Sequence, residues 1–288
     1  MMNLDSKIGK SLGRLPAFPA TVHKVTSLIN NPDSSLSELV DVIRLDQAIT
    51  ANILRMCNSA YFGLRHKVDN VHDAIMYLGK QNVVRAVMAA GTSRFFKDTP
   101  GYEAEARDLW EHAVGTALMS QILARKILGR EDPQLFTAAL LHDIGKIILG
   151  EFVSEKYHEI KNGMSMRSCS FLEAEEEALG MNHAVVGGVI ITAWNFPQNI
   201  QQAIAFHHRP DRHPATASPI PWLIHLADQA CLIMGIGYGT DGLSYQELDE
   251  AMNRFGFTHQ DFEEAMSLLV TELDSARELI GIVQSKAA

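Results

Sequence analysis

The chain has 288 residues, 47% hydrophobic and 20% charged, so it can fold around a sizeable core and is not expected to be disordered. Its net charge of −9 argues against a protein whose main task is to coat nucleic acid. Three scattered cysteines, a polar N-terminus and the lack of a long apolar run argue against a disulfide framework, a signal peptide and a membrane span. We therefore expect a cytoplasmic protein.

The first part of the chain contains sequence signals for the starts and ends of several helices. Ser35 and Glu38 form a capping-box pattern before an apolar periodic run. Asn70 precedes a second such run, AIMYLG, in which Gly79 is typical of the residue that follows a helix. We expect residues 15–97 to form one helical lobe with a core poor in histidine.

The pattern breaks at Asp98-Thr-Pro-Gly101 and then continues with further helix signals. Asp132-Pro133 is a cap followed by proline at the first helical position, and it predicts one helix over LFTAALLHDIGKIIL. Ser170 with Glu173 and then Asn182 predict two more helix starts. We expect a second lobe over residues 102–235. Ser244 with Glu247 predicts C-terminal helices over 243–288, and no alternating strand pattern is convincing, so the fold class is all-α and two-lobed.

Histidine and aspartate recur at the predicted helices of the second lobe. In chain order these residues are His112, His142, Asp143, His183, His207, His208 and Asp228. His142 and Asp143 lie between the apolar runs AALL and IGKIIL, where an unpaired buried carboxylate would cost several kcal/mol. A metal ion would compensate Asp143. Adjacent residues on a helix diverge by about 100°, so His142 and Asp143 could flank one ion or each contact a different ion, and the second arrangement suits a two-metal centre.

Imidazole and carboxylate donors without a thiolate favour a catalytic-type site for divalent Fe, Mn, Ni or Zn over a closed structural zinc site. We expect two ions, one held by His112, His142, Asp143 and Asp228 and the other by His183, His207 and His208, with one carboxylate bridging them. Each residue alone has an ordinary alternative. A single histidine is more often a core or surface residue, adjacent histidines can be a cation pair at a helix C-terminus, and Asp228 could be exposed.

Lys146 follows His142 by four residues and Asp143 by three, on the same predicted helix face. Its functional interpretation is a cation directed at a metal-bound phosphate, which would make Asp143 and Lys146 the catalytic pair. Its alternative is a surface lysine whose stem packs on apolar neighbours. The seven remaining histidines lack the buried context and are interpreted as structural: His23, His66, His72, His158, His213, His225 and His259.

The order H…HD…H…HH…D, with the run LLHDIGK at its centre, resembles the HD superfamily of metal-dependent phosphohydrolases. Longer runs resemble the HDOD family more specifically: RLPAFPATVHKV, LVDVIRLDQAITANILRMCNSAYFG, VDNVHDAIMYLGKQNVV and EEEALGMNHAVVGGVIITAWNFPQNIQQAIAFHHRP. The resemblance covers about residues 15–230. Many HDOD members resemble degenerate relatives without the metal ligands, whereas this chain keeps them. Arg209-Pro210 follows the double histidine with no GYP tripeptide, unlike the related HD-GYP phosphodiesterases.

The resemblance implies an all-helical fold and a role in bacterial signal transduction as a regulatory output or binding module. Such a module would bind a signalling protein, a nucleotide-type phosphate ligand, or both, with no nucleic acid and no membrane among its partners. The retained ligand set implies an alternative, an active metal-dependent phosphohydrolase that acts on a nucleotide-type phosphoester. Both functions remain open at the level of sequence.

Overall fold

The structure is a computed structural model that describes residues 4–29, 31, 33–58, 67–96, 98–167, 169–213, 218–237 and 245–284. Within these ranges the chain is helical and contains no β-strand, only an isolated bridge between Thr99 and Ala104. The predicted all-α class is confirmed. None of the helices in the described ranges is long and apolar enough to span a membrane.

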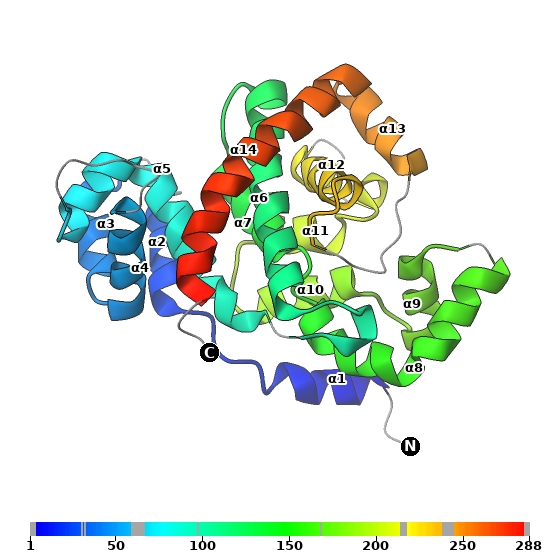
Figure 1. Cartoon of the computed structure of the whole chain (residues 1–288). Coiled ribbons are helices and arrows are strands. Elements are labelled where there is room, and N and C mark those ends of the chain that lie inside the picture. Colours follow the sequence, from blue (N-terminus) through cyan, green and yellow to red (C-terminus); the bar gives the residue numbers. More distant parts are fainter. Residues whose placement is uncertain are drawn as a thin grey trace. The chain divides into compact units, whose positions relative to one another are not determined.

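The chain divides into two compact units (Figure 1), of which unit 1 comprises residues 1–17 and 95–269 and unit 2 comprises residues 18–94 and 270–288. The lobe boundaries expected from the sequence, 15–97, 102–235 and 243–288, remain a prediction about which segments fold together. Ser244, the cap expected before the last helices, lies outside the described residues.

Unit 2 contains the helices α2 (Ala20–Ile29), α3 (Leu36–Ile43), α4 (Gln47–Cys57) and α5 (Val71–Thr92), and the 3-10 turn η2 (Ser93–Phe95) follows at its edge. The capping box of Ser35 and Glu38 and the cap by Asn70 are both confirmed. Gly79 adopts a left-handed φ of 77°, but the helix resumes directly after it, so α5 is kinked at the position where the sequence predicts an end. The helices α3 and α4 bury Leu39, Ile43 and Ile53 completely.

Unit 1 contains most of the remaining elements; α1 is blue in Figure 1, and the others run in chain order from cyan-green to orange. They are α1 (Leu4–Leu12), η3 (Pro100–Tyr102), α6 (Ala106–Leu128), α7 (Pro133–Leu141), α8 (Lys146–Arg167), α9 (Phe171–Leu179), α10 (His183–Ala193), α11 (Gln198–Ala205), η4 (Pro210–Arg212), α12 (Ile220–Ile233) and α13 (Tyr245–Arg254). The last helix, α14 (His259–Gln284), begins in unit 1 and ends in unit 2. Caps at Asp132, Ser170 and Asn182 are confirmed.

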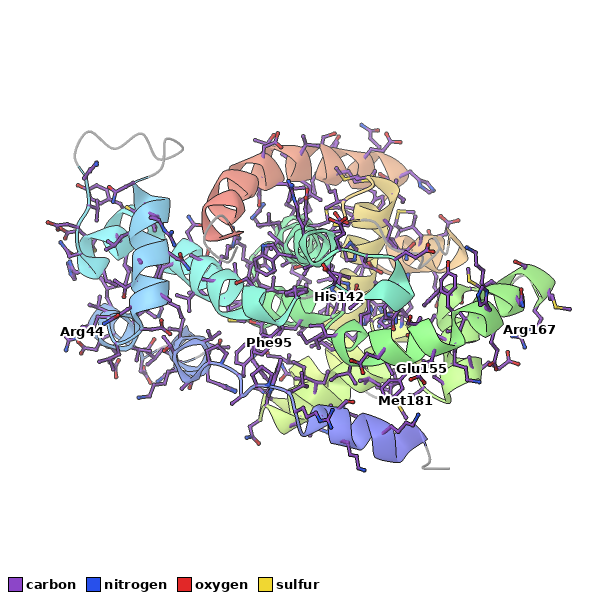
Figure 2. The ribbon with its side chains drawn as sticks, turned by 60° about the horizontal axis from the view of Figure 1, so that its bottom comes forward. Arg44, Phe95, His142, Glu155, Arg167 and Met181 are labelled. Carbon is purple, nitrogen blue, oxygen red and sulfur yellow. The ribbon has the colours of Figure 1, made fainter. Side chains whose placement is uncertain are left out.

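Packing within unit 1 brings together helices that are far apart in the sequence. The long helix α6 packs against α7 and α12, α10 packs against α8 and α11, and α11 also contacts α7 and α12. His142 lies in the interior of unit 1, whereas Arg167 lies at the outer end of α8 (Figure 2). Most interior side chains are apolar, and the buried histidines and acids form a compact group among them.

One sequence expectation about this region is wrong. LFTAALLHDIGKIIL does not form a single helix, because α7 ends at Leu141 and α8 begins at Lys146, with residues 142–145 in a turn. The apolar pattern runs through the break because both helices and the turn are buried. His142 and Asp143 therefore lie on a connection between two helices and not in the middle of one.

Candidate metal centre

The turn at residues 142–145 packs directly against the start of α10. A Cβ atom added to Gly145 would lie 1.9 Å from the carbonyl oxygen of His183 and 2.8 Å from the backbone nitrogen of Gly187. No side chain fits there without movement of the backbone, so glycine is required by the close approach of two chain segments. This contact brings the first residue of α10, His183, next to Asp143.

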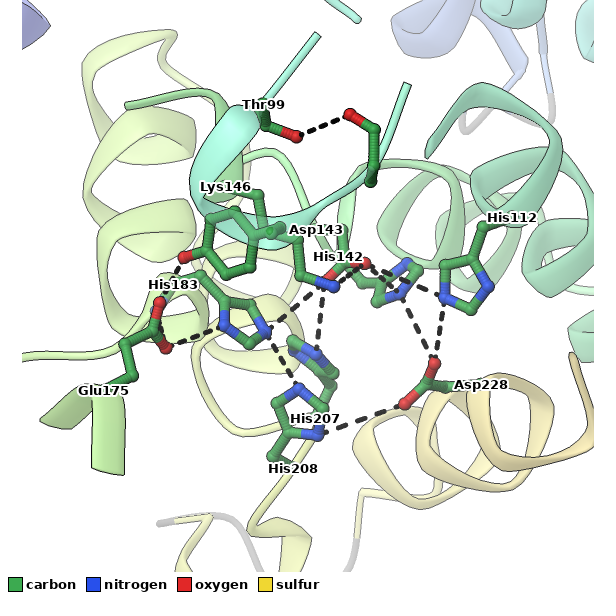
Figure 3. A network of polar contacts seen from close by, with 12 residues as sticks. Thr99, His112, His142, Asp143, Lys146, Glu175, His183, His207, His208 and Asp228 are labelled. Atoms are coloured by element: carbon green, nitrogen blue, oxygen red, sulfur yellow. Dashed lines mark hydrogen bonds and ion pairs between the residues drawn. The ribbon is translucent and has the colours of Figure 1, made fainter. Parts of the chain in front are cut away.

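The other candidate residues come from three further places in unit 1. His112 lies on α6 and Asp228 on α12, and these two helices pack against each other. His207 and His208 directly follow α11. The structure thus brings every sequence-predicted metal residue, together with Lys146, into one buried cluster (Figure 3).

The first group of donors gathers around one oxygen of Asp143. The Oδ2 atom of Asp143 lies 3.7 Å from His112 Nε2 and 3.4 Å from His142 Nε2. The Oδ1 atom of Asp228 lies 3.0 Å from the same nitrogen of His112 and 3.8 Å from that of His142. Two imidazoles and two carboxylates are therefore within the reach of a single ion.

The second group gathers around the other oxygen of Asp143. Its Oδ1 atom lies 3.4 Å from His183 Nε2 and 4.0 Å from His207 Nε2. The Nε2 atoms of His183 and His208 are 2.9 Å apart, the separation of two neighbouring ligands at about 2.1 Å from one ion. Both groups have spacing suited to a metal ion, and Asp143 belongs to each of them.

Backbone carbonyls fix the tautomers of three histidines. The Nδ1 atoms lie 2.7 Å from Ala139 O for His142, 2.7 Å from Ile204 O for His207 and 3.0 Å from Ile236 O for His112. Because a carbonyl oxygen can only accept, each Nδ1 must donate. In the neutral imidazole Nε2 then carries the lone pair, and this atom points into the cluster, as a metal ligand requires.

His183 is oriented by a carboxylate in place of a carbonyl. Glu175 Oε2 lies 2.9 Å from His183 Nδ1 and accepts the backbone N–H of the same residue at 3.0 Å. The hydroxyl of Tyr102 donates to the other oxygen, Oε1. Glu175 is completely buried. Glu175 is placed as the outer partner that a histidine ligand of a metal ion typically has.

Glu175 and His225 contact candidate metal residues, and the sequence interpretation included neither of them in the site. Glu175 is one of three consecutive acids, but it shares a helix face with Phe171 and Leu179, four residues away on either side, and a carboxylate on a core-facing position was the available signal. His225, interpreted as structural, is fully buried, and its Nδ1 lies 3.0 Å from the backbone oxygen of His207. No sequence pattern would have indicated that contact.

Three buried polar atoms of the cluster lack a hydrogen-bond partner among the described residues: His142 Nε2, His207 Nε2 and Asp228 Oδ2. Each such atom costs about 1–3 kcal/mol if nothing satisfies it. All three are electron-pair donors directed at the cluster, so the residues present fit a metal ion.

The protonation states of His207, His208, Asp143 and Asp228 also favour a cation. Burial, together with the charge of His142, lowers the pKa of His207 to about 3, and burial also lowers the pKa of His208 well below its usual range. These two imidazoles are neutral near pH 7. Burial opposes ionisation of Asp143 and Asp228, but the neighbouring histidines outweigh it and hold both pKa values below the ordinary range. Neutral imidazoles and ionised carboxylates are the forms that bind metal.

Lys146 lies inside the cluster and not on the surface. Its Nζ atom is 2.6 Å from Asp143 Oδ2 and 5.6 Å from the centre of the Tyr102 ring. Only 4% of the residue is exposed. The surface alternative is therefore excluded, whereas its expected contact with a phosphate stays a prediction.

Comparison with known proteins identifies relatives with little assigned function. An uncharacterised protein of Treponema pallidum (strain Nichols) is 24% identical over 219 residues, which are 75% of this chain and 42% of that protein. The match thus spans less than half of the relative's length.

Solved structures share the helical fold. An HDOD domain protein of unknown function from Geobacter sulfurreducens has a TM-score of 0.71 at 22% identity and covers 98% of both chains. A candidate phosphohydrolase from Shewanella amazonensis SB2B has a TM-score of 0.70 at 21% identity, over 95% of this chain and 97% of that one. A candidate signal transduction protein from Marinobacter aquaeolei VT8 has a TM-score of 0.75 at 21% identity, over 97% of this chain and 65% of that one.

Family membership follows from the sequence match. The model of the HDOD domain matches residues 15–210, more than half of the chain, and includes the turn at 142–145 and the double histidine. The chain belongs to the HDOD domain family.

Proposed function

We propose that the cluster is a two-metal centre that binds and hydrolyses a nucleotide-type phosphoester. One position would be held by His112, His142, Asp143 and Asp228, and the other by Asp143, His183, His207 and His208. The observation that carries the proposal is the division of the donors into two groups that share Asp143, one oxygen facing each group. Divalent Fe, Mn, Ni or Zn suits such nitrogen and oxygen donors.

Bound ions of this kind lower the pKa of coordinated water and neutralise the oxygens of a phosphoryl group. The chain's own residues supply the rest. Asp143 orients both positions, while the fixed Nδ1 contacts hold the imidazoles of His112, His142 and His207 in place. Lys146, 2.6 Å from Asp143, adds a buried positive charge beside the place where phosphoryl oxygens would bind.

Elemental analysis of purified and reconstituted protein tests the centre. A panel of phosphomonoesters, phosphodiesters, nucleotides and cyclic nucleotides tests the activity. We expect bound metal and hydrolysis of at least one class, both lost in Asp143→Ala. Asp249→Ala is the matched control, because Asp249 is an exposed acid of the same unit outside the cluster. Absence of metal after reconstitution with each candidate ion would refute the two-metal centre.

A second candidate function is a signalling module that binds metal but hydrolyses no substrate. The low solvent exposure of the cluster favours it. The side chains of six of its seven donors are at most 6% exposed, and the ammonium of Lys146 is already paired with the shared carboxylate. Such a centre could hold a ligand or a protein partner in a fixed state. Tight metal binding with no hydrolysis across the panel would favour this module over the enzyme.

A further inference from the structure

Access to the candidate metal centre is restricted to one side. His142 and His207 have no exposed side-chain surface, and Asp143, Asp228 and His183 have at most 4%. The side chain of His208 is 14% exposed, more than that of any other donor. A ligand that reaches the centre from solvent would therefore pass His208 first.

A cavity of about 190 Å³ opens next to this histidine. It lies among α9, the first turn of α10, the end of α11 and η4, and all of its lining residues belong to unit 1. His208 forms part of its wall, while the Nε2 atom of the same ring lies 2.9 Å from His183 inside the cluster. The cavity and the metal centre thus share one side chain.

The charge of the cavity is positive. Arg209 and Arg212 line it, and Arg209 is held by Glu176, with 3.0 Å between Nη1 and Oε2. Arg212 is exposed and forms no ion pair with a residue in the described part of the chain. Arg209 and Arg212 exceed Glu176 by one positive charge, without any contribution from His208. This excess favours an anion.

The remaining wall is apolar. Leu172, Val185 and Phe206 line the cavity, and Val185 is 45% exposed although it is a large aliphatic residue. An arginine beside an apolar wall matches a ligand that carries a phosphate and a carbon skeleton together. The volume is below the roughly 300–1,000 Å³ typical of sites that enclose a whole drug-sized ligand. It is suited to one small organic group next to a phosphate.

We propose that this cavity is the docking site of a small organic phosphate, with Arg212 binding the phosphate, Val185 and Phe206 packing on the organic group, and His208 leading to the metal centre. The proposal extends the proposed function, because it rests on metal in the cluster to complete phosphate binding. It assigns the choice of ligand to α10 and η4 and not to the metal ligands.

Phenyl phosphate is the probe, compared with inorganic phosphate and with phenol, by isothermal titration of metal-loaded protein. We expect phenyl phosphate to bind more tightly than either fragment. Arg212→Ala should weaken its binding by about tenfold, the typical effect of losing a charged hydrogen bond. Val185→Asp, which places a negative charge on the apolar wall, should weaken it similarly. Metal content measured on each variant should stay at the wild-type level.

Arg130→Ala is the matched control, because Arg130 is also exposed and lies in unit 1 just beyond the end of α6 that is far from His112. The affinity of Arg130→Ala for phenyl phosphate should equal that of the wild type. Wild-type affinity in both Arg212→Ala and Val185→Asp would overturn the cavity proposal, as would no binding to a wild type that holds its metal. If the wild type takes up no metal, the proposed function fails, and the Arg212 dependence of phenyl phosphate binding then decides the cavity separately.

Discussion

His183 is held from both ends of its ring. One nitrogen faces Asp143 and His208 inside the cluster, and the other is 2.9 Å from Glu175, which Tyr102 in turn orients. Such outer partners fix the direction of a ligand and increase its basicity. If His183 ligates a metal ion as proposed, Glu175 would affect the metal affinity without contacting the ion itself.

Replacement of Glu175 should weaken metal binding without removing a ligand. We expect Glu175→Ala to reduce affinity by about 10–100-fold, the usual effect of losing such a partner. Glu175→Gln keeps an acceptor for His183 Nδ1 and should recover part of the loss. Competition with a chelator measures the metal affinity of both variants. The control is Glu177→Ala, an exposed acid on the same helix that pairs with Arg167; equal affinity in Glu175→Ala and Glu177→Ala would exclude the role.

Metal affinity should fall as pH decreases. Burial by itself would lower the pKa values of His142 and His183, but Asp143 and Glu175 outweigh it and raise them above the ordinary 6.5. Protons therefore compete with metal at these two residues already near neutral pH. His207, with a pKa of about 3, contributes no competing proton in this range. Titrations at pH 8, 7 and 6 should show increasing dissociation constants, and a constant value over that range would contradict the account.

At the scale of elements, the caps were predictable and the break between α7 and α8 was not. Ser35, Asp132 and Ser170 mark helix starts because their side chains bond to backbone N–H groups a few residues away. The break at residues 142–145 depends on α10, which approaches Gly145 from a distant part of the sequence. Local patterns hold no information about that contact.

The same distinction applies to the candidate site. Its candidate metal residues could be singled out because they recur as a set in apolar surroundings, although each residue alone has an ordinary interpretation. For Glu175 the sequence offers only its core-facing position, because its contacts with Tyr102 and His183 involve other segments. Ligation itself stays a prediction from geometry.

Gly145→Ala should damage the centre through the backbone. The added Cβ would overlap the carbonyl oxygen of His183, so the turn and α10 must separate. We expect a loss of about 1–3 kcal/mol of unfolding free energy, as for other overpacked sites, and weaker metal binding. Gly9→Ala in α1 is the control, because a Cβ there would meet nothing within 4 Å. Denaturant unfolding measures both variants, and unchanged stability of Gly145→Ala would show that the segments can part freely.

Leu141 and His142 are neighbours at the end of α7 and should respond differently to metal. Leu141 is fully buried, so Leu141→Ala should cost about 2–5 kcal/mol whether or not metal is present. His142→Ala should instead lose most of the stabilisation by metal, with little change in helix content. Thermal melts of both variants, each with chelator and with added metal, distinguish the loss of packing in Leu141→Ala from the loss of metal stabilisation in His142→Ala. If His142→Ala keeps the full shift, His142 is not a ligand.

For the molecule as a whole, all candidate donors belong to unit 1. Metal that binds only the folded site should stabilise this unit by about 2.7 kcal/mol when free ion is a hundredfold above the dissociation constant. Hydrogen exchange should show the added protection in α6, α7, α10 and α12. The internal reference is the set of amides in α2, α3 and α4 that exchange by local opening, because their exchange rates should not change when metal binds to unit 1. Identical exchange in unit 1 with and without tightly bound ion would show that the site is not coupled to folding.

The sharing of Asp143 has a consequence for how the two positions fill. Its Oδ1 and Oδ2 atoms face different groups, and both move with the same side-chain torsion. The first ion to arrive would fix that torsion, so the second would meet a carboxylate whose rotational freedom is already lost. Repulsion between the ions acts in the opposite direction. Whichever effect is larger, each ion would change the affinity for the other by the same factor, so the two proposed positions would load as a linked pair and not as independent sites.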